Sequence, residues 1–183
     1  MFFNLLALFF KTSRLFVAIS AASIFFGCTT SPHVSHIGDV DSDGYYESLT
    51  PLGKKGYFLK QLAPNVYFFS TGTYNNLFVA TQEGVVITDP IKGKGDLLKK
   101  AIGEITNQPI RFMIYSHSHI DHIGDAHLFA SDNVQIVAQV ETGKALKKYK
   151  DKNRPIPQIN FGKNYSLSIG GITLELIYLG EGH

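Results

Sequence analysis

Residues 116 to 125 read SHSHIDHIGD and place three histidines and two aspartates within ten positions. His117 and His119 are two residues apart, so in an extended turn their side chains point the same way and can reach one metal ion. Asp121 and His122 lie further along, where the loop enters a helix, and can reach a second ion beside the first. Imidazole nitrogen and carboxylate oxygen suit zinc, and also iron or manganese.

A loop rich in histidine can also be exposed to solvent without any function. Its histidines can also be buried in the core, where they hydrogen-bond to their neighbours. Three histidines and an aspartate at this spacing, directly after the apolar run IRFMIY, favour a metal site over both alternatives. Structural zinc sites are usually saturated by cysteines, and Cys28 is the only cysteine of the chain. We therefore expect a catalytic ion with one position open to water.

Three short β-prone runs precede the histidine-rich loop and are separated by residues that favour turns. We expect them to form an antiparallel meander that ends at Asp89-Pro90; the runs are Asn65–Ser70, Asn76–Thr81 and Val85–Thr88. Apolar residues at helical spacing then predict a helix over residues 95–108, with Asp96 as its N-cap. The continuous apolar run 109–115 predicts a strand that is covered on both faces and leads directly into the loop.

The segment after the loop alternates between helical and strand patterns. The predicted elements are a helix over 125–132, a strand over 134–139, a helix over 141–150, a polar connection over 150–158, and strands over 164–169 and 172–179. Gly170-Gly171 between the last two strands is a good signal for a two-residue hairpin. Together these elements predict an α/β (α+β) fold, in which a mixed β-sheet carries helices on one face.

The motif His117-x-His119-x-Asp121-His122 resembles that of the metallo-β-lactamase fold hydrolases, and the resemblance extends from about Val66 to His183. The resemblance implies an αββα sandwich, of which this chain supplies the first half only. It also implies that His117, His119 and His183 bind a first metal ion, and that Asp121 and His122 bind a second. Asp121 would in addition be catalytic, because it would accept a hydrogen bond from the metal-bound water and orient it.

Other residues near the motif have two interpretations each. Asp89 resembles a family aspartate that supports the metal ligands from behind, or is a simple turn former. Tyr74 and Asn75 border the substrate mouth, or are ordinary turn residues. Asp125 is interpreted as structural, in the first turn of a helix, and His127 as a residue of a helix surface.

The first 27 residues are predicted to be a signal segment. Lys11 and Arg14 precede a 12-residue apolar run, which has the length of a signal-peptide core and is shorter than a membrane span of about 20 residues. The following FFGC resembles the lipobox of bacterial lipoproteins, in which the cysteine, here Cys28, is lipidated. A cleaved secretory signal and an uncleaved anchor are the alternatives. Residues 28–56 are predicted to be a linker to a domain over 57–183.

The net charge of the chain indicates which classes of binding partner are expected. The formal net charge of +2 comes from Lys11 and Arg14, and the rest of the chain carries 15 basic and 15 acidic residues. The chain has no stripe of Lys and Arg that could neutralise a phosphate backbone, so we do not expect it to bind nucleic acid. The resemblance to the hydrolases implies a small-molecule substrate. The predicted location is the bacterial cell envelope or periplasm, with the protein attached to the membrane by a lipid or signal anchor; the oligomeric state is left open.

The residues and the resemblance together predict a metal-dependent hydrolase, with one or two zinc ions. A zinc ion lowers the pKa of bound water to about 7, which provides hydroxide for attack on a carbonyl or ester centre such as that of a β-lactam. The alternatives are a non-catalytic metal-binding remnant and an iron-dependent oxygenase on the same scaffold.

The family pattern continues beyond His183, the last residue of the sequence. We therefore expect a truncated chain in which the second sheet is incomplete and the inner face of the first sheet is exposed. Such a chain would be poorly folded and inactive by itself, whereas its intact parent would be a hydrolase. Metal stoichiometry and turnover of the two forms test this expectation, and activity of the short form would contradict it.

Overall fold

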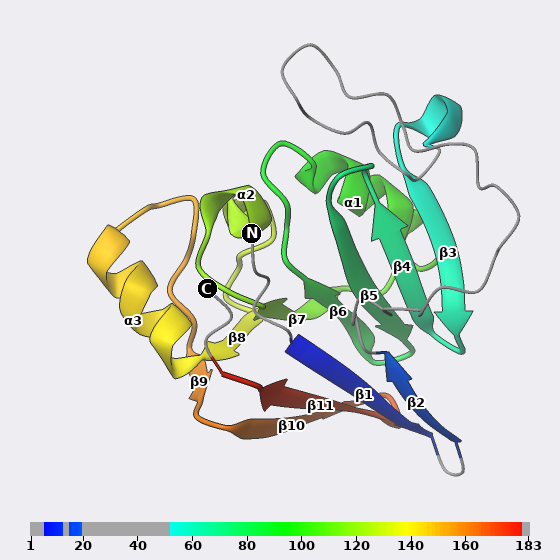
Figure 1. Cartoon of the computed structure of the whole chain (residues 1–183). Helices are drawn as coiled ribbons and strands as arrows, with labels where there is room; N and C mark the ends of the chain where they lie inside the picture. The colour runs from blue at the N-terminus through cyan, green and yellow to red at the C-terminus, as the bar shows by residue number, and fades with distance from the viewer. Residues whose placement is uncertain (1–5, 13–14, 20–51, 181–183) are drawn as a thin grey trace, which may run out of the picture.

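The computed structural model describes the backbone of residues 6–12 and 15–19, and all of residues 52–180 (Figure 1). Its centre is a seven-stranded sheet in the order β3-β4-β5-β6-β7-β8-β9. The first four strands form an antiparallel meander, and β6, β7, β8 and β9 are parallel neighbours. The strands are β3 (Phe58–Ala63), β4 (Val66–Ser70), β5 (Asn75–Thr81), β6 (Gly84–Thr88), β7 (Ile110–Tyr115), β8 (Gln135–Gln139) and β9 (Ile159–Phe161).

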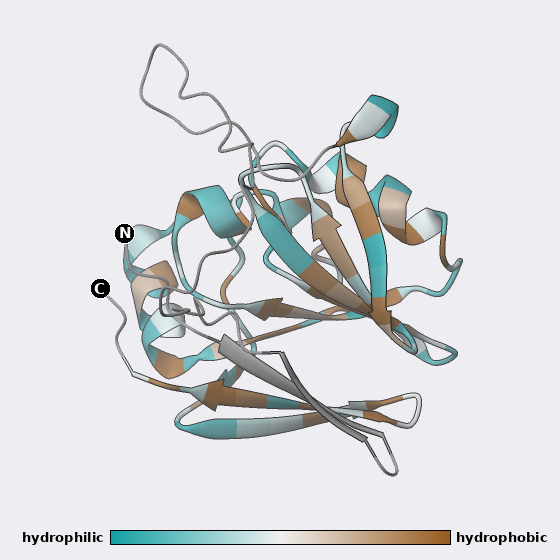
Figure 2. Ribbon diagram, turned by 45° about the vertical axis from the view of Figure 1, so that its right-hand side comes forward, coloured by the Kyte–Doolittle hydropathy of each residue, from teal (hydrophilic) through white to brown (hydrophobic). Residues whose placement is uncertain are grey.

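The helices cover one face of this sheet, as the sequence predicts. They are α1 (Gly95–Gly103), α2 (Ile120–Ile123) and α3 (Val140–Tyr149), together with the 3-10 turns η1 (Gly53–Lys55) and η2 (Ala126–Leu128). Leu98, Ile123 and Leu146, one from each helix, are buried in a single cluster with side chains of the sheet. In Figure 2 the helices carry both hydrophobic and hydrophilic residues, as expected for elements with one buried face.

A second sheet covers the opposite face. It contains β10 (Asn164–Ile169) and β11 (Ile172–Tyr178), followed in order by β1 (Leu6–Thr12) and β2 (Leu15–Ile19). The prediction of one mixed sheet that includes the last hairpin is therefore wrong. Leu167, Leu174 and Leu176 of this hairpin are buried in one cluster with strand residues of the central sheet, including Val86 and Ile114. The expectation that this inner face is exposed is likewise corrected.

The alternation of residues along the hairpin explains why it leaves the central sheet. In β10 and β11 the buried positions recur every second residue, at Leu167 and Ile169 and at Ile172, Leu174 and Leu176. Each strand therefore has one apolar face, and removal of this surface from water stabilises the fold by about 25 cal/mol per Å². The apolar inner face of the central sheet is the surface that the hairpin covers.

The strands β1 and β2 fall within the predicted signal segment, and β1 pairs antiparallel with both β11 and β2. Cys28 and most of the predicted linker over 28–56 lie outside the described residues. The signal segment, the lipid site and the domain boundaries thus stay predictions. Within the described residues, no helix is both long enough and apolar enough to cross a membrane.

Two local predictions next to the histidine-rich loop are wrong. The helix predicted over 125–132 is reduced to the turn η2. The N-cap of α1 is Lys94, and Asp96 lies inside the first turn. The acceptor at this helix start comes from another segment, because Asp125 Oδ2 accepts a hydrogen bond of 2.8 Å from the Gly95 amide. Asp125 thus has a structural role, as predicted, but it accepts a hydrogen bond from the first turn of α1.

The turn between β10 and β11 gives a prediction about stability. Gly170 and Gly171 have φ values of 53° and 76°, as in a type I′ hairpin turn. A Cβ on Gly170 would lie 2.4 Å from Cβ of Thr81 in β5, whereas a Cβ on Gly171 would meet nothing within 4 Å. We expect Gly170→Ala to lower the free energy of unfolding by about 1 to 3 kcal/mol more than Gly171→Ala. Urea unfolding of both variants measures the difference, and equal losses would contradict the packing of this turn on β5.

Candidate metal centre

The parallel pairing of β6 and β7 brings the first groups of the site together. Thr88 lies opposite Ile114, so the residues that follow the two strands leave the sheet at the same edge. Asp89 follows β6, and Ser116 and His117 follow β7. The amide of Asp89 donates a hydrogen bond of 3.0 Å to the Ile114 carbonyl, which fixes this edge.

Asp89 is held by several hydrogen bonds in a buried position. Its φ is +35°, a left-handed value that is uncommon for a residue with a side chain and that is often found at functional sites. The Ser116 amide donates to Asp89 Oδ1 at 2.8 Å, the Ser116 hydroxyl donates to Oδ2, and Asn76 Nδ2 donates to the Asp89 carbonyl at 3.0 Å. Burial raises the pKa of Asp89, and the Ser116 hydrogen bonds and nearby His122 offset this rise only in part.

Ser116 links Asp89 to the first histidine of the loop. Its Oγ lies 2.8 Å from Nδ1 of His117. With Asp89 ionised, the single hydroxyl proton is donated to the carboxylate, so Oγ accepts a hydrogen bond from Nδ1–H of His117. This tautomer makes Nε2 the ring nitrogen that can offer a lone pair to a metal ion.

The three imidazoles of the loop converge on His117. The ring of His117 lies 4.3 Å from that of His122 and 4.8 Å from that of His119, between ring centres. One potential ligand atom from each of Asp89, His117 and His122 lies within 4.8 Å of the others. His117 is buried, His122 is half-buried and His119 is exposed.

Asp121 lies beside these imidazoles and contacts Tyr74. Its Oδ2 accepts a hydrogen bond of 3.2 Å from the Tyr74 hydroxyl and lies 3.7 Å from Nε2 of His122. The ring of Tyr74 also meets His122 edge-on, with 5.4 Å between ring centres. Partial burial raises the pKa of Asp121, but a backbone hydrogen bond, His122 and the Tyr74 hydroxyl outweigh it, so the pKa lies below its ordinary value.

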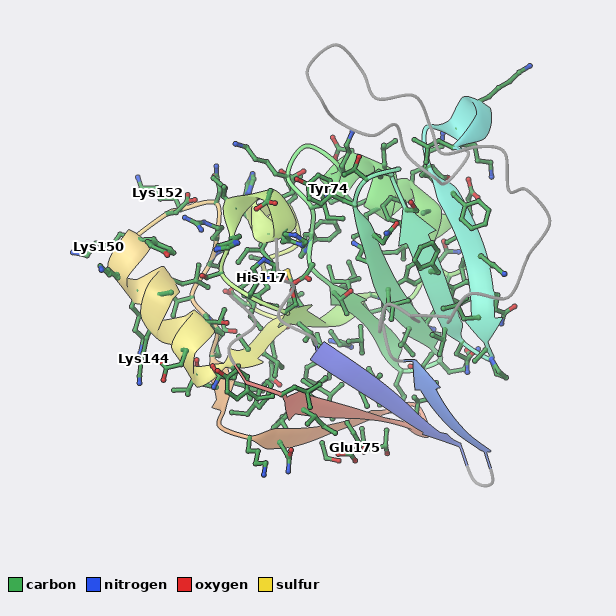
Figure 3. All side chains as sticks on the ribbon, viewed as in Figure 1. Tyr74, His117, Lys144, Lys150, Lys152 and Glu175 are labelled. Atoms are coloured by element: carbon green, nitrogen blue, oxygen red, sulfur yellow. The ribbon has the colours of Figure 1, made fainter. Side chains whose placement is uncertain are left out.

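Among the described residues, the compact group of potential ligand atoms unites His117 and His122 of the loop with Asp89. His119 and Asp121 lie beside this group, next to His117 and His122 respectively. Figure 3 labels His117 and Tyr74 in this region. Imidazole nitrogen and carboxylate oxygen are ligand types that suit zinc, iron or manganese. Asp89 belongs to the compact group, although both of its carboxylate oxygens already accept hydrogen bonds from Ser116. His183 lies outside the described residues, so its predicted ligand role stays a prediction. His127 is exposed, as predicted for a surface residue.

Two residues of the site were not predicted. Ser116 lies directly before His117 in the sequence, and no function was assigned to it. Arg154, in the polar connection after α3, donates from Nη1 to the carbonyl of Ser118 at 2.5 Å. The position of Ser116 next to a ligand histidine was an available signal, whereas nothing in the sequence links Arg154 to the loop.

The Tyr74 hydroxyl gives a prediction for the metal-free protein. Because this hydroxyl donates to the charged form of Asp121, we expect Tyr74→Phe to raise the pKa of the Asp121 carboxyl. Carboxyl-carbon NMR titration measures the change. Tyr165→Phe is the control, because Tyr165 packs on Phe161, away from the loop. An unchanged pKa of Asp121 in Tyr74→Phe would contradict the contact.

Comparison with known proteins gives consistent matches. The family model described as "Metallo-beta-lactamase superfamily" matches residues 71–183. Metallo-beta-lactamase IND-1 of Chryseobacterium indologenes is 32% identical over 111 residues, which cover 60% of this chain and 45% of that protein. The alpha subunit of 2,4-dinitroanisole O-demethylase from Nocardioides sp. (strain JS1661) is 29% identical over 122 residues, with coverage of 64% and 37%.

A solved structure of a metallo-beta-lactamase from Pontibacter korlensis superimposes with a TM-score of 0.55. The match has 22% identity and covers 65% of this chain and 59% of that one, so it shows the fold alone. The match covers 37% of the demethylase subunit and 45% and 53% of two curated metallo-beta-lactamases, so this chain spans about half or less of the length of these relatives.

Proposed function

Because the chain belongs to the metallo-beta-lactamase superfamily, we propose that it acts as a zinc-dependent hydrolase on a small molecule with a carbonyl or ester-type centre. The proposal replaces the expectation of a poorly folded, inactive chain, which rested on an exposed inner face that the last hairpin covers. The observation that carries the proposal is the convergence of Asp89, His117 and His122, whose potential ligand atoms lie within 4.8 Å of one another. A buried carboxylate and buried or half-buried imidazoles gathered at the carboxyl ends of parallel strands are typical of a functional site.

Of the compact group, His117 and His122 would hold the metal, whereas Asp89 would support His117 through Ser116, because both of its carboxylate oxygens accept hydrogen bonds from Ser116. The other potential ligands also come from the loop. His117, His119 and His122 offer imidazole nitrogens and Asp121 offers a carboxylate, with His183 as a further ligand that the resemblance implies. When bound, the zinc ion supplies a Lewis acid that lowers the pKa of a coordinated water to about 7.

The side chains around the ligands have their own tasks. Ser116 and Asp89 hold His117 in one tautomer and one ring orientation, which is a common function of groups behind a metal ligand. Asp121 is ionised at neutral pH because its pKa is low, so its carboxylate can accept a hydrogen bond from the attacking water. Tyr74 donates to Asp121 and keeps that carboxylate oriented.

The substrate class is the finer part of the proposal. The relatives include proteins named as metallo-beta-lactamases and one named as the alpha subunit of 2,4-dinitroanisole O-demethylase, so the family alone does not determine the substrate. The test is turnover of a β-lactam, a thioester, a carboxylic ester and an aryl methyl ether by the zinc-loaded and the iron-loaded protein. Hydrolysis of an acyl substrate by the zinc form supports the proposal. Turnover by the iron form alone, or metal bound without any turnover, would overturn it.

A further inference from the structure

Arg154 connects the polar segment after α3 to the backbone of the histidine-rich loop. Its Nη1 donates a hydrogen bond of 2.5 Å to the carbonyl of Ser118, the residue between His117 and His119. Its Nε donates to Oδ2 of Asp151 at 2.7 Å. Only 10% of the Arg154 side chain is exposed, so these hydrogen bonds are formed largely out of water.

The segment that carries Arg154 is itself anchored to the fold. The Asn153 amide donates to Oδ1 of Asp151 at 2.9 Å, and the Asn153 carbonyl accepts from the His127 amide at 3.1 Å. The carbonyl of Pro155 accepts a hydrogen bond of 3.2 Å from the hydroxyl of buried Tyr115 in β7. Arg154 is thus fixed from both sides, and its guanidinium is a rigid support for the loop.

We propose that Arg154 is a positioning residue for the metal centre, which fixes the peptide between His117 and His119 so that both imidazoles point at the same ion. The effect on metal affinity rests on the proposed function. The effect on the conformation of the loop does not rest on the proposed function, because the protein forms the hydrogen bond to Ser118 without a metal ion.

The two hydrogen bonds require arginine. The planar guanidinium has donors in a fixed fork, so it reaches Asp151 and the Ser118 carbonyl together, whereas a lysine ammonium on a flexible stem is a single charged point. A guanidinium also stacks well on an aromatic ring, and the Arg154 guanidinium carbon lies 5.0 Å from the centre of the Tyr149 ring. Arg154→Lys therefore separates loss of the fork from loss of the charge.

The chain offers a control ion pair with the same spacing but a more exposed position. Lys144 and Glu141 in α3 form another ion pair three residues apart, with a length of 2.8 Å against 2.7 Å for Arg154 and Asp151. Lys144 is 67% exposed and lies on the outer side of α3, away from His117 (Figure 3). Lys144→Met removes a similar pair without any contact to the loop.

The experiment compares wild type, Arg154→Met, Arg154→Lys and Lys144→Met by two measurements. Zinc affinity is measured by competition with a chromophoric chelator, and hydrogen–deuterium exchange is measured on the metal-free proteins. We expect Arg154→Met to bind zinc roughly 10- to 100-fold more weakly, as is common for residues behind a metal ligand. We also expect exchange of residues 116–124 to accelerate in Arg154→Met, with a smaller change in Arg154→Lys and no change in Lys144→Met.

The outcomes separate this inference from the proposed function. If wild type binds no zinc but Arg154→Met still loosens residues 116–124 selectively, the proposed function fails and the positioning role stands. Unchanged exchange of the loop in Arg154→Met would overturn the positioning role. Exchange that accelerates equally in the meander β4–β6 would also overturn it, because Arg154 would then stabilise the whole fold rather than the loop.

Discussion

Replacement of His117 by alanine is expected to weaken zinc binding at least 100-fold and to reduce hydrolysis to the rate of the metal-free protein. His117 is the imidazole that lies close to both other rings, at 4.3 Å from His122 and 4.8 Å from His119. Its loss removes a ligand rather than a group behind a ligand, and even the latter loss typically costs 10- to 100-fold in metal affinity. Chelator competition measures the affinity, and turnover at saturating zinc measures the second effect.

The matched control for this experiment is His127→Ala. His127 is an exposed histidine ten residues further along, and it is absent from the compact group of potential ligands. We expect its replacement to leave zinc affinity and turnover at the values of wild type. Equal losses in the two variants would mean that histidine content in general, and not the converging loop, determines metal binding.

Ser116→Ala is expected to have the second largest effect, because it breaks the link from Asp89 to His117. The buried Asp89 carboxylate loses the hydroxyl hydrogen bond, and a buried acceptor left without its partner costs about 1 to 3 kcal/mol in the free energy of unfolding. His117 also loses the group at Nδ1 that selects its tautomer, so zinc affinity should fall roughly 10- to 100-fold. Urea unfolding of the metal-free protein and chelator competition measure the two effects.

The pH dependence of this destabilisation has a defined sign. Burial raises the pKa of Asp89 in the folded state above the ordinary aspartate value of about 3.9, and Ser116 limits the rise. The folded state then binds the proton more tightly than the unfolded state, so stability falls as pH rises from the ordinary value through the raised one. Because Ser116→Ala raises this pKa further, its destabilisation should be larger at pH 7 than at pH values below about 4.

The control for Ser116→Ala is Ser118→Ala, two residues along the same loop. Within residues 52–180 the hydroxyl of Ser118 forms no hydrogen bond, so its removal should leave both stability and zinc affinity nearly unchanged. Destabilisation of the same size in both variants would contradict the special role of Ser116.

The sequence was sufficient to predict the parts of the site that are local. The period-2 and continuous apolar runs predicted β4 to β8 and the meander, because those patterns depend on which faces are buried. The same patterns placed the histidine-rich loop directly after β7. The spacing predicted that His117 and His119 reach one ion and that Asp121 and His122 reach a second, and this assignment of ligands stays a prediction. The described structure places the ring of His117 4.8 Å from that of His119 and 4.3 Å from that of His122.

The parts that could not be predicted depend on contacts between distant segments. Arg154 reaches Ser118 across 36 positions, and Asp125 serves the start of α1 across 30 positions, and neither contact leaves a periodic pattern. The N-cap prediction failed for that reason, since local capping rules cannot see an acceptor from another segment. The strand β9 has three residues, which is too few for alternation to be recognised.

The packing of the last hairpin needed the tertiary structure as well. The two strands over 164–169 and 172–179 and their turn at Gly170-Gly171 were correctly predicted. The structure adds that each strand has one apolar face. The same pattern is compatible with an edge position in the central sheet and with a layer beneath it. The structure shows that the hairpin forms a separate layer, because its leucines are buried against Val86, Ile114 and Val137 of the central sheet.

The zinc-edge X-ray absorption spectrum of the zinc-loaded protein shows which side chains bind the metal. We expect zinc bound only by nitrogen and oxygen, with the multiple-scattering signature of at least two imidazoles and with the loss of at least one of them in His117→Ala. A zinc ion with a sulfur ligand, or one without imidazole scattering, would contradict the claim that the loop after β7 forms the metal centre.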